Sequence, residues 1–220
     1  MARRKAIRVH YSDRFIADSH FGHQLMVSDR KDKDGNITRP RLRNFASIDD
    51  HDEHLIACWN AVVTPTTAVY HLGDFAFWKL PIERVKAIFD QLNGRKYLLL
   101  GNHDTLEVER LGWFEVYTGP VHFMDTSTGR KFVASHHPQR EWDGWWNGAC
   151  HIHGHTHANL PSSRRSLDVG VDNVGFVPLT AGEIFDRMAL LPELDFRGVP
   201  VPDFVPGQGG DEDDTPGVRR

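Results

Sequence analysis

Short runs of β-branched and aromatic residues alternate with amphipathic segments in the first half of the chain. The runs predict strands over residues 9–17, 68–72 and 97–100. Between them, one segment with apolar residues at helical spacing follows Ser47, a typical N-cap residue, and a second runs from Pro81 to a stop at Gly94. Residues 28–40 show no apolar period and predict an exposed loop.

The second half of the chain carries mainly strand signals. Strands are predicted over residues 121–124, 131–134, 150–153 and 167–171. A final helix begins at the capping box formed by Thr180 and Glu183. This order predicts an α/β fold for a single domain over 1–196, with two sheets packed together and helices outside. Residues 197–220 are rich in Pro, Gly and acids, which predicts a flexible tail.

Composition narrows the class of protein. The chain has 220 residues, 40% hydrophobic and 25% charged, which is typical of a soluble globular domain. No apolar run approaches the roughly 20 residues of a membrane span, and no signal-peptide core follows the basic start, so we expect a cytoplasmic protein without membrane contact. The net charge of −4 argues against a broad surface for extended nucleic acid.

Histidine is unusually abundant, whereas cysteine is scarce. The chain contains 14 His and 2 Cys, and neither Cys58 nor Cys150 belongs to a CxxC motif. A metal site in this chain would therefore use imidazoles and carboxylates as ligands.

Polar motifs follow five of the predicted strands. They are Asp18-Ser19-His20, Gly73-Asp74, Gly101-Asn102-His103-Asp104, Ser135-His136-His137-Pro138 and Gly154-His155-Thr156-His157. In the Asp-x-His and His-x-His motifs the outer side chains project to the same side of an extended backbone and can converge on one ion. Neighbouring Asn102 and His103 should diverge. This mixture of nitrogen and oxygen donors suits Mn, Fe, Zn or Ni better than Ca or Mg.

These motifs, in this order, resemble the signature of the calcineurin-like metallophosphoesterases, in particular compact bacterial and phage-type members. The resemblance spans Asp18 to His157 and implies a four-layer αββα sandwich with a dinuclear metal site at the strand-end loops. It implies one divalent ion held by Asp18, His20 and His157, a second held by Asn102, His136 and His155, and an Asp74 carboxylate that bridges them. His103 would be the catalytic histidine, oriented by Asp104.

The resemblance further implies hydrolysis of a small phosphodiester or phosphomonoester. The expected reaction is in-line attack of a metal-bridging hydroxide, with His103 assisting the departing oxygen. Two alternatives stay open: a nuclease of the same superfamily, and a non-catalytic metal-binding interaction module. The oligomeric state is also open.

Several further residues have two interpretations. His23 and His137 either reach the site or are ordinary exposed residues, and His151 with His153 either support the ligands or pack in the core. The Trp-rich segment 140–147 is either an aromatic rim for substrate or a loop fixed by burial of its Trp side chains. Arg43 and Arg140 are candidates for holding a phosphate oxygen.

Overall fold

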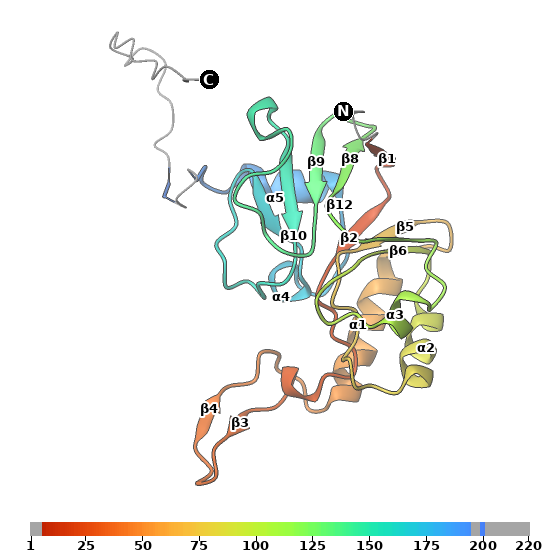
Figure 1. Ribbon diagram of the computed structural model, residues 1–220, viewed down its shortest axis with the longest axis vertical. Helices are drawn as coiled ribbons and strands as arrows, with labels where there is room; N and C mark the ends of the chain where they lie inside the picture. Colours follow the sequence, from red (N-terminus) through yellow and green to blue (C-terminus); the bar gives the residue numbers. More distant parts are fainter. Residues whose placement is uncertain (1–5, 195–198, 201–220) are drawn as a thin grey trace.

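Two five-stranded mixed sheets pack face to face in the computed structural model, which describes residues 6–194 and 199–200 (Figure 1). In spatial order, the first sheet contains β1 (Ile7–Val9), β8 (Val121–Asp125), β9 (Lys131–Ala134), β10 (Cys150–His153) and β11 (Ser166–Asp168). The second contains β12 (Leu179–Thr180), β2 (Arg14–Ile16), β5 (Ala68–His71), β6 (Arg95–Leu99) and β7 (Glu115–Tyr117). The α/β class with two sheets is therefore as predicted. Apart from Val199 and Pro200, the predicted tail lies outside the described residues.

The first predicted strand is in fact two strands in different sheets. A turn separates β1 from β2: the Asp13 amide donates to the His10 carbonyl oxygen at 3.0 Å, and the His10 amide donates to the Asp13 carboxylate at 2.8 Å. β1 then pairs in parallel with β8, and β2 pairs in parallel with β5. The prediction of one strand was wrong because the apolar pattern continues across the turn, which is formed by polar local contacts.

Aromatic side chains fill the space between the sheets. The Phe15 ring of the second sheet meets Phe123 and Phe132 of the first sheet edge-on, each at a centroid distance of 5.3 Å, and stacks on Tyr70. Burying a ring of this size stabilises the fold by roughly 1.5–3 kcal/mol. These contacts hold the two sheets in a fixed relation, and with them the loops at the sheet ends.

Helices cover the outer face of the second sheet. α1 (Ile48–Val62) begins at the predicted cap Ser47, whose hydroxyl accepts the Asp50 amide, and α2 (Ile82–Gln91) follows Pro81. Their apolar faces pack in one cluster with Leu98 of β6. The remaining helices are α3 (Leu106–Glu109), α4 (Val171–Val174) and α5 (Ala181–Ala189), the last with the predicted capping box.

The outer face of the first sheet departs from the expected layer of helices. Among the described residues, Val133 on this face packs against Trp142 and Ala149, in a segment that contains the short 3-10 helix η2 (Trp145–Asn147). α5 instead joins the apolar cluster between the sheets, where Phe185 meets Phe132 at 5.7 Å. The Trp142 side chain thus covers part of this face, where a fourth layer of helices was expected.

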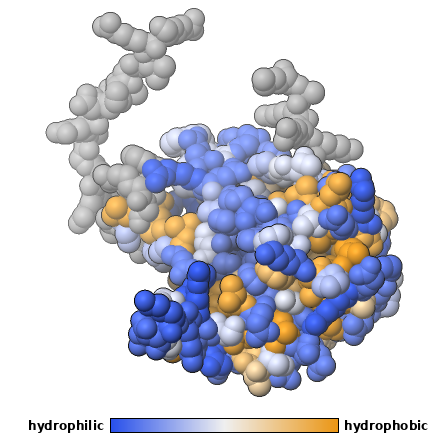
Figure 2. Space-filling model, turned by 60° about the horizontal axis from the view of Figure 1, so that its bottom comes forward, coloured by the Kyte–Doolittle hydropathy of each residue, from blue (hydrophilic) through white to orange (hydrophobic). Residues whose placement is uncertain are grey.

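A hairpin replaces the loop predicted over 28–40. β3 (Arg30–Lys31) and β4 (Ile37–Arg39) pair antiparallel, and all of their side chains are exposed. The hairpin extends away from the body in Figure 1, and Figure 2 shows it as a hydrophilic projection at the lower left. The short 3-10 helix η1 (Gln24–Met26) anchors its base, because the Leu42 and Arg43 amides both donate to the Met26 carbonyl oxygen. We call residues 29–41 the arm.

The loops after the parallel strands of both sheets meet at one end of the molecule. The Ala17 amide donates to the Val169 carbonyl oxygen at 3.1 Å, which joins the loop after β2 to the loop after β11 across the two sheets. The Gly154 amide likewise donates to the His136 carbonyl oxygen at 2.9 Å. Among residues 6–194 and 199–200, no helix combines the length and the apolar character needed to cross a membrane.

Candidate metal centre

The structure brings the predicted ligands together at this end of the sheets. Ligand atoms of Asp18, His20 and His157 lie within 4.8 Å of one another, as predicted for the first ion, and the same holds for Asp18, Asp74 and His136. Asn102 lies beside the second group, with its Oδ1 3.0 Å from His136 Nε2. Residues up to 139 positions apart in the chain therefore share one small site.

Backbone conformation at these residues is unusual. Seven non-glycine residues of the described chain have positive φ, and five of them are predicted ligands: Asp18, His20, Asp74, His155 and His157. Side chains with a Cβ rarely adopt this region, and each such residue costs on the order of 1–3 kcal/mol. Backbone hydrogen bonds hold the strained loops, including Asp18 N–H to Gly73 O and His20 N–H to Asp74 O, both 3.0 Å. Strain concentrated at one cluster is typical of a functional site.

Two glycines allow the carboxylates to approach other loops closely. A Cβ at Gly154 would lie 2.5 Å from Asp18 Oδ2, and a Cβ at Gly101 would overlap Asp74 Oδ1. Any side chain at either position would therefore displace a predicted ligand. The glycines of the GNHD and GHTH motifs are required by this packing.

His20 is the clearest sign that a cation fits. Its side chain is 1% exposed, yet neither ring nitrogen has a hydrogen-bond partner among the described residues. Burial lowers the pKa of His20 well below its usual value, so the ring is neutral and carries a free lone pair. Its Nε2 points to Asp74 Oδ2 at 3.5 Å. Buried polar atoms normally have partners, and a divalent ion would supply the missing one.

The two carboxylates differ in their environments. Burial raises the pKa of Asp18 to about 7, and its two oxygens accept the His155 amide at 3.0 and 2.9 Å. Burial also acts to raise the pKa of Asp74, but the hydrogen bonds to His136 and to the His103 amide and the charge of His136 outweigh it and hold that pKa well below its usual range. Asp74 is thus ionised, and a bound cation would favour the ionised form of Asp18 as well.

Asp172 and Arg43 support His157. His157 Nδ1 lies 2.7 Å from Asp172 Oδ2, which leaves Nε2 free for a metal ion. The Arg43 guanidinium donates to both oxygens of Asp172 at 2.8 Å and to the carbonyl oxygens of Asp18 and Ser19. Arg43 is 2% exposed and fully engaged, so the prediction that it holds a phosphate oxygen was wrong. The sequence carried no signal for this pairing, which joins residues 129 positions apart.

Further contacts orient the remaining ligands. His136 Nδ1 lies 2.8 Å from the Leu72 carbonyl oxygen, so Nε2 faces the site. His71 accepts the Gly73 amide at Nδ1 and lies 2.8 Å from Ser19 Oγ at Nε2. Burial lowers the pKa of His71 to about 3, which keeps it neutral between the two loops.

The Asn102 and His103 side chains of the GNHD motif diverge, as predicted, and the Asp104 carboxylate contacts backbone amides. Asn102 faces His136, whereas the His103 ring lies 5.4 Å from the His20 ring. The Asp104 carboxylate accepts three backbone amides, those of Asp74, Phe75 and Gly101, at 2.8–2.9 Å. Its oxygens are therefore used to join two loops, and it positions His103 through the backbone rather than through a bond to the ring.

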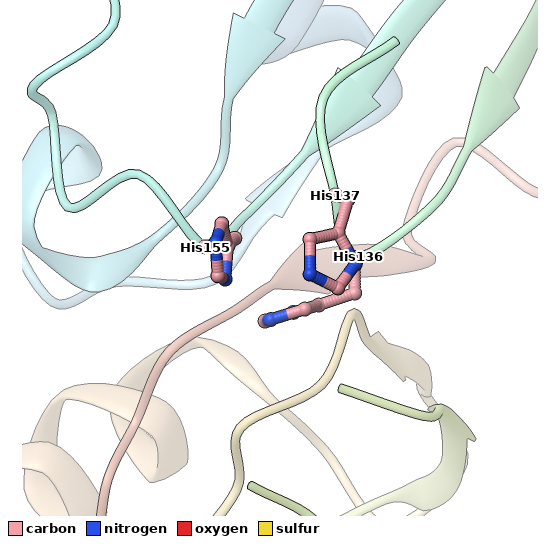
Figure 3. Close-up of side chains that lie close together, drawn as sticks. All are labelled: His136, His137 and His155. Carbon is pink, nitrogen blue, oxygen red and sulfur yellow. The ribbon is translucent and has the colours of Figure 1, made fainter. Parts of the chain in front are cut away.

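A second cluster of imidazoles lies beside the first. Figure 3 shows His136 and His137 on the loop after β9, facing His155 from the loop after β10. One nitrogen of each ring lies within 4.8 Å of the others. His137 is thus placed at the position expected for the second ion, although its role was left open by the sequence.

The other open interpretations divide as follows. His23 packs on Phe77 at 4.5 Å and lies beside the His20 ring, whereas His151 is a buried core residue stacked on Trp142. Trp142 is fixed by burial and donates to the Ala149 carbonyl oxygen, while Trp146 is 84% exposed. Burial of Trp142 explains part of the Trp-rich segment, and a substrate rim stays a prediction for Trp146.

Comparisons with known proteins give relatives of similar length. No protein-family model matches the chain. An uncharacterized protein of Methanocaldococcus jannaschii is 28% identical over 176 residues, which cover 75% of this chain and 84% of that protein. The gene 66 protein of Mycobacterium phage L5 is 28% identical over 205 residues, covering 78% and 91%. The crystal structure of a protein of unknown function from Aquifex aeolicus matches with a TM-score of 0.61 and 22% identity, over 82% of this chain and all of that one. At this identity the structural likeness shows the fold alone.

Proposed function

We propose that this chain is a dinuclear metal-dependent phosphoesterase of the calcineurin-like class. The observation that carries the proposal is the cluster of strained, buried ligand residues around His20, whose two ring nitrogens have no partner among the described residues. Asp18, His20 and His157 would hold one ion, and Asn102, His136 and His155 the other, with Asp74 between them. The mixed donor set favours Mn, Fe, Zn or Ni.

Charge supports an anionic substrate. Two divalent ions would bring four positive charges, of which Asp18 and Asp74 offset two, so the site would be positive in a chain of net charge −4. When bound, the ions supply activation of a water molecule near neutral pH and neutralisation of charge on the phosphoryl oxygens. Asp18 and Asp74 hold this centre on rigid loops, which fixes the substrate phosphorus relative to His103.

His103 is placed to move the proton of the leaving group. Its ring is partly exposed beside His20 and has no hydrogen-bond partner among the described residues, so a ring nitrogen is available to the substrate. The Asp74 carboxylate accepts the His103 amide at 2.9 Å, which fixes the ring relative to the ligands. A general acid of this kind contributes about 10²–10⁴-fold to the rate.

A cavity beside the site could receive the organic part of the substrate. It has a volume of about 220 Å³ and is lined by His136, His137, Leu99, Thr118 and Gln139, among others. A larger cavity of about 490 Å³ contains Tyr70 and Tyr97 but none of the predicted ligands. The smaller cavity therefore fits the proposal better and favours a compact leaving group.

The test is hydrolysis of a generic aryl phosphodiester and an aryl phosphomonoester by the full chain with Mn²⁺, Zn²⁺, Fe²⁺ or Ni²⁺. We expect turnover that a chelator abolishes, at least 100-fold less turnover in His103→Ala with metal content unchanged, and loss of both in Asp74→Asn. His54→Ala, an exposed histidine of α1, is the control. Two bound ions without turnover of any phosphoester would contradict the enzyme proposal and favour the interaction module.

The arm favours a second candidate, a nuclease of the same class. It carries five basic and three acidic residues. Asp29 pairs with Arg41 and Asp32 accepts amides of the turn, whereas in the described chain no carboxylate pairs with the other four basic residues, Arg30, Lys31, Lys33 and Arg39. The charge of Arg39 also contributes to lowering the pKa of His23 beside the site, after the larger effect of burial. A basic arm whose base follows His23 in the chain and which projects from the body fits a long polyanion that extends beyond the site.

Binding of a fluorescent single-stranded oligonucleotide tests this candidate. We expect affinity that falls steeply with salt, and Arg30→Glu/Lys31→Glu should weaken it about tenfold and reduce the salt slope by about one per lost phosphate contact. Lys86→Glu/Arg110→Glu, on the helical face, is the matched control. Equal binding by both double variants would leave the small phosphoester as the favoured substrate.

A further inference from the structure

We propose that His137 is a third imidazole ligand of the second cation position, which makes this position selective for Zn²⁺ over Mn²⁺. The inference rests on the proposed dinuclear function and adds a ligand that the motif comparison does not assign. It is carried by the cluster of His136, His137 and His155, in which one nitrogen of each ring lies within 4.8 Å of the others.

The backbone of His137 is fixed by its neighbours. The Ser135 hydroxyl donates to the His137 carbonyl oxygen at 2.7 Å, and Gln139 Nε2 donates to the same hydroxyl at 3.2 Å. Pro138 restricts the preceding residue to extended conformations. The Gln139 amide donates to His151 Nε2 of the buried core at 3.2 Å. An exposed histidine is thus held on a loop that is anchored on both sides of it.

The three rings face one another at metal-binding range. The His137 and His155 ring centroids are 4.2 Å apart, and those of His136 and His137 are 4.9 Å apart (Figure 3). His136 Nδ1 is taken by the Leu72 carbonyl oxygen, so its Nε2 is the available donor. Within the described chain, the His137 ring has no hydrogen-bond partner. Zn–N bonds of about 2.0–2.1 Å require nitrogens closer than 4.8 Å, so small rotations of the exposed ring complete the site.

The donor sets of the two positions differ in chemistry. Asp18, His20 and His157 provide one carboxylate and two nitrogens, whereas the second position would combine the Asn102 amide oxygen with the three imidazoles of the cluster, and Asp74 is shared by both positions. Imidazole suits Zn and Ni, while carboxylate oxygen suits Mn. A third imidazole therefore increases the difference between the positions, and His137 determines which metal the second one prefers.

Metal titration of the chelator-treated full chain tests this role without any turnover assay. Zn²⁺ and, separately, Mn²⁺ are titrated against a chromophoric chelator, and Co²⁺ absorption reports the coordination. We expect two Zn²⁺ in the wild type, and His137→Ala and His137→Gln should weaken the second step at least tenfold, leave the first step and Mn²⁺ binding within about twofold, and change the Co²⁺ spectrum. His54→Ala is the control, and circular dichroism confirms folding.

The outcomes separate this inference from the proposed function. Unchanged Zn²⁺ affinity and Co²⁺ spectrum in both His137 variants would overturn the ligand role, even if the enzyme hydrolyses phosphoesters. Zn²⁺ binding that depends on His137 in a protein with no phosphoester turnover would support the ligand role and contradict the proposed activity. A wild type that binds fewer than two ions would overturn both.

Discussion

Individual histidines in this molecule perform distinct tasks that their environments determine. His20 is buried and neither of its ring nitrogens has a hydrogen-bond partner among the described residues, whereas both nitrogens of His71 are engaged between two loops and His151 stacks on Trp142 in the core. Burial lowers the pKa of all three, so each is neutral at physiological pH. The unpaired ring nitrogens, rather than the residue type, distinguish His20 as a ligand candidate from His71 and His151, which support the structure.

Asp172→Asn tests the support of the first cation position at the scale of one residue. Burial acts to lower the pKa of His157, but the hydrogen bond to Asp172 and the charges of Asp18 and Asp172 together outweigh it and raise that pKa, so loss of the Asp172 charge makes the imidazole a weaker donor. We expect about 10–100-fold weaker binding of the ion at this position, with the second position unchanged. Isothermal titration calorimetry measures the affinity of each position for the metal ion.

The matched control for this prediction is Asp186→Asn, which removes an exposed acid from α5. Arg43 keeps its bonds to the Asp18 and Ser19 carbonyl oxygens in Asp172→Asn, so the loop should stay in place. Equal metal affinity in Asp172→Asn and Asp186→Asn would show that Asp172 does not support His157 as a ligand and serves only to neutralise the charge of Arg43.

At the scale of elements, local patterns predicted most of the helices and strands but not their pairing. Ser47 and the Thr180–Glu183 pair marked helix starts correctly because caps are local interactions. The separation of β1 from β2 was missed because a change of sheet leaves the apolar pattern unchanged. The arm was missed as a hairpin because its strands bury no face and therefore show no alternation.

The same distinction applies to the candidate site. Motifs at strand ends predicted which side chains meet, since loops after neighbouring parallel strands converge. The supporting contacts were not predictable: Arg43 reaches Asp172 across 129 positions, and nothing in either local sequence indicates the partner. For Asp104 the resemblance implied that it orients His103, but it did not indicate how: the carboxylate accepts the Asp74 and Phe75 amides of another loop.

At the scale of the whole molecule, the proposed cations would connect the two sheets. Asp18, His20, Asp74 and Asn102 belong to loops of the sheet that contains β2, β5 and β6, whereas His136, His155 and His157 follow β9 and β10 of the other sheet. Ligands that bind only the folded state stabilise it. Removal of the ions should therefore lower the stability of the entire domain rather than loosen one loop.

This connection gives the stability of the metal-free protein a characteristic pH dependence. Burial raises the pKa of Asp18 to about 7 from its ordinary value near 3.8. An acid whose folded pKa is raised stabilises the fold fully below its ordinary pKa, and that stability is lost progressively as the pH rises from about 3.8 to about 7. Each pH unit between about 4 and 7 should therefore cost about 1 kcal/mol, or roughly 2–4 °C in Tm for a domain of this size, and the loss should level off above pH 7, where Asp18 is ionised in both the folded and the unfolded state.

The comparison that isolates this effect is Asp18→Asn, which keeps the shape of the side chain but does not titrate. With chelator present, we expect the Tm of the wild type to fall relative to that of Asp18→Asn between about pH 4 and 7 and to run parallel to it above pH 7, because only the wild type carries a titrating carboxyl group at this position. With Mn²⁺ or Zn²⁺ present, the order should reverse, since a cation stabilises the ionised carboxylate only in the wild type. Parallel Tm curves in chelator below pH 7 would mean that water or a rearrangement of the loops keeps the pKa of Asp18 near its ordinary value, and that the two sheets do not hold the site rigid.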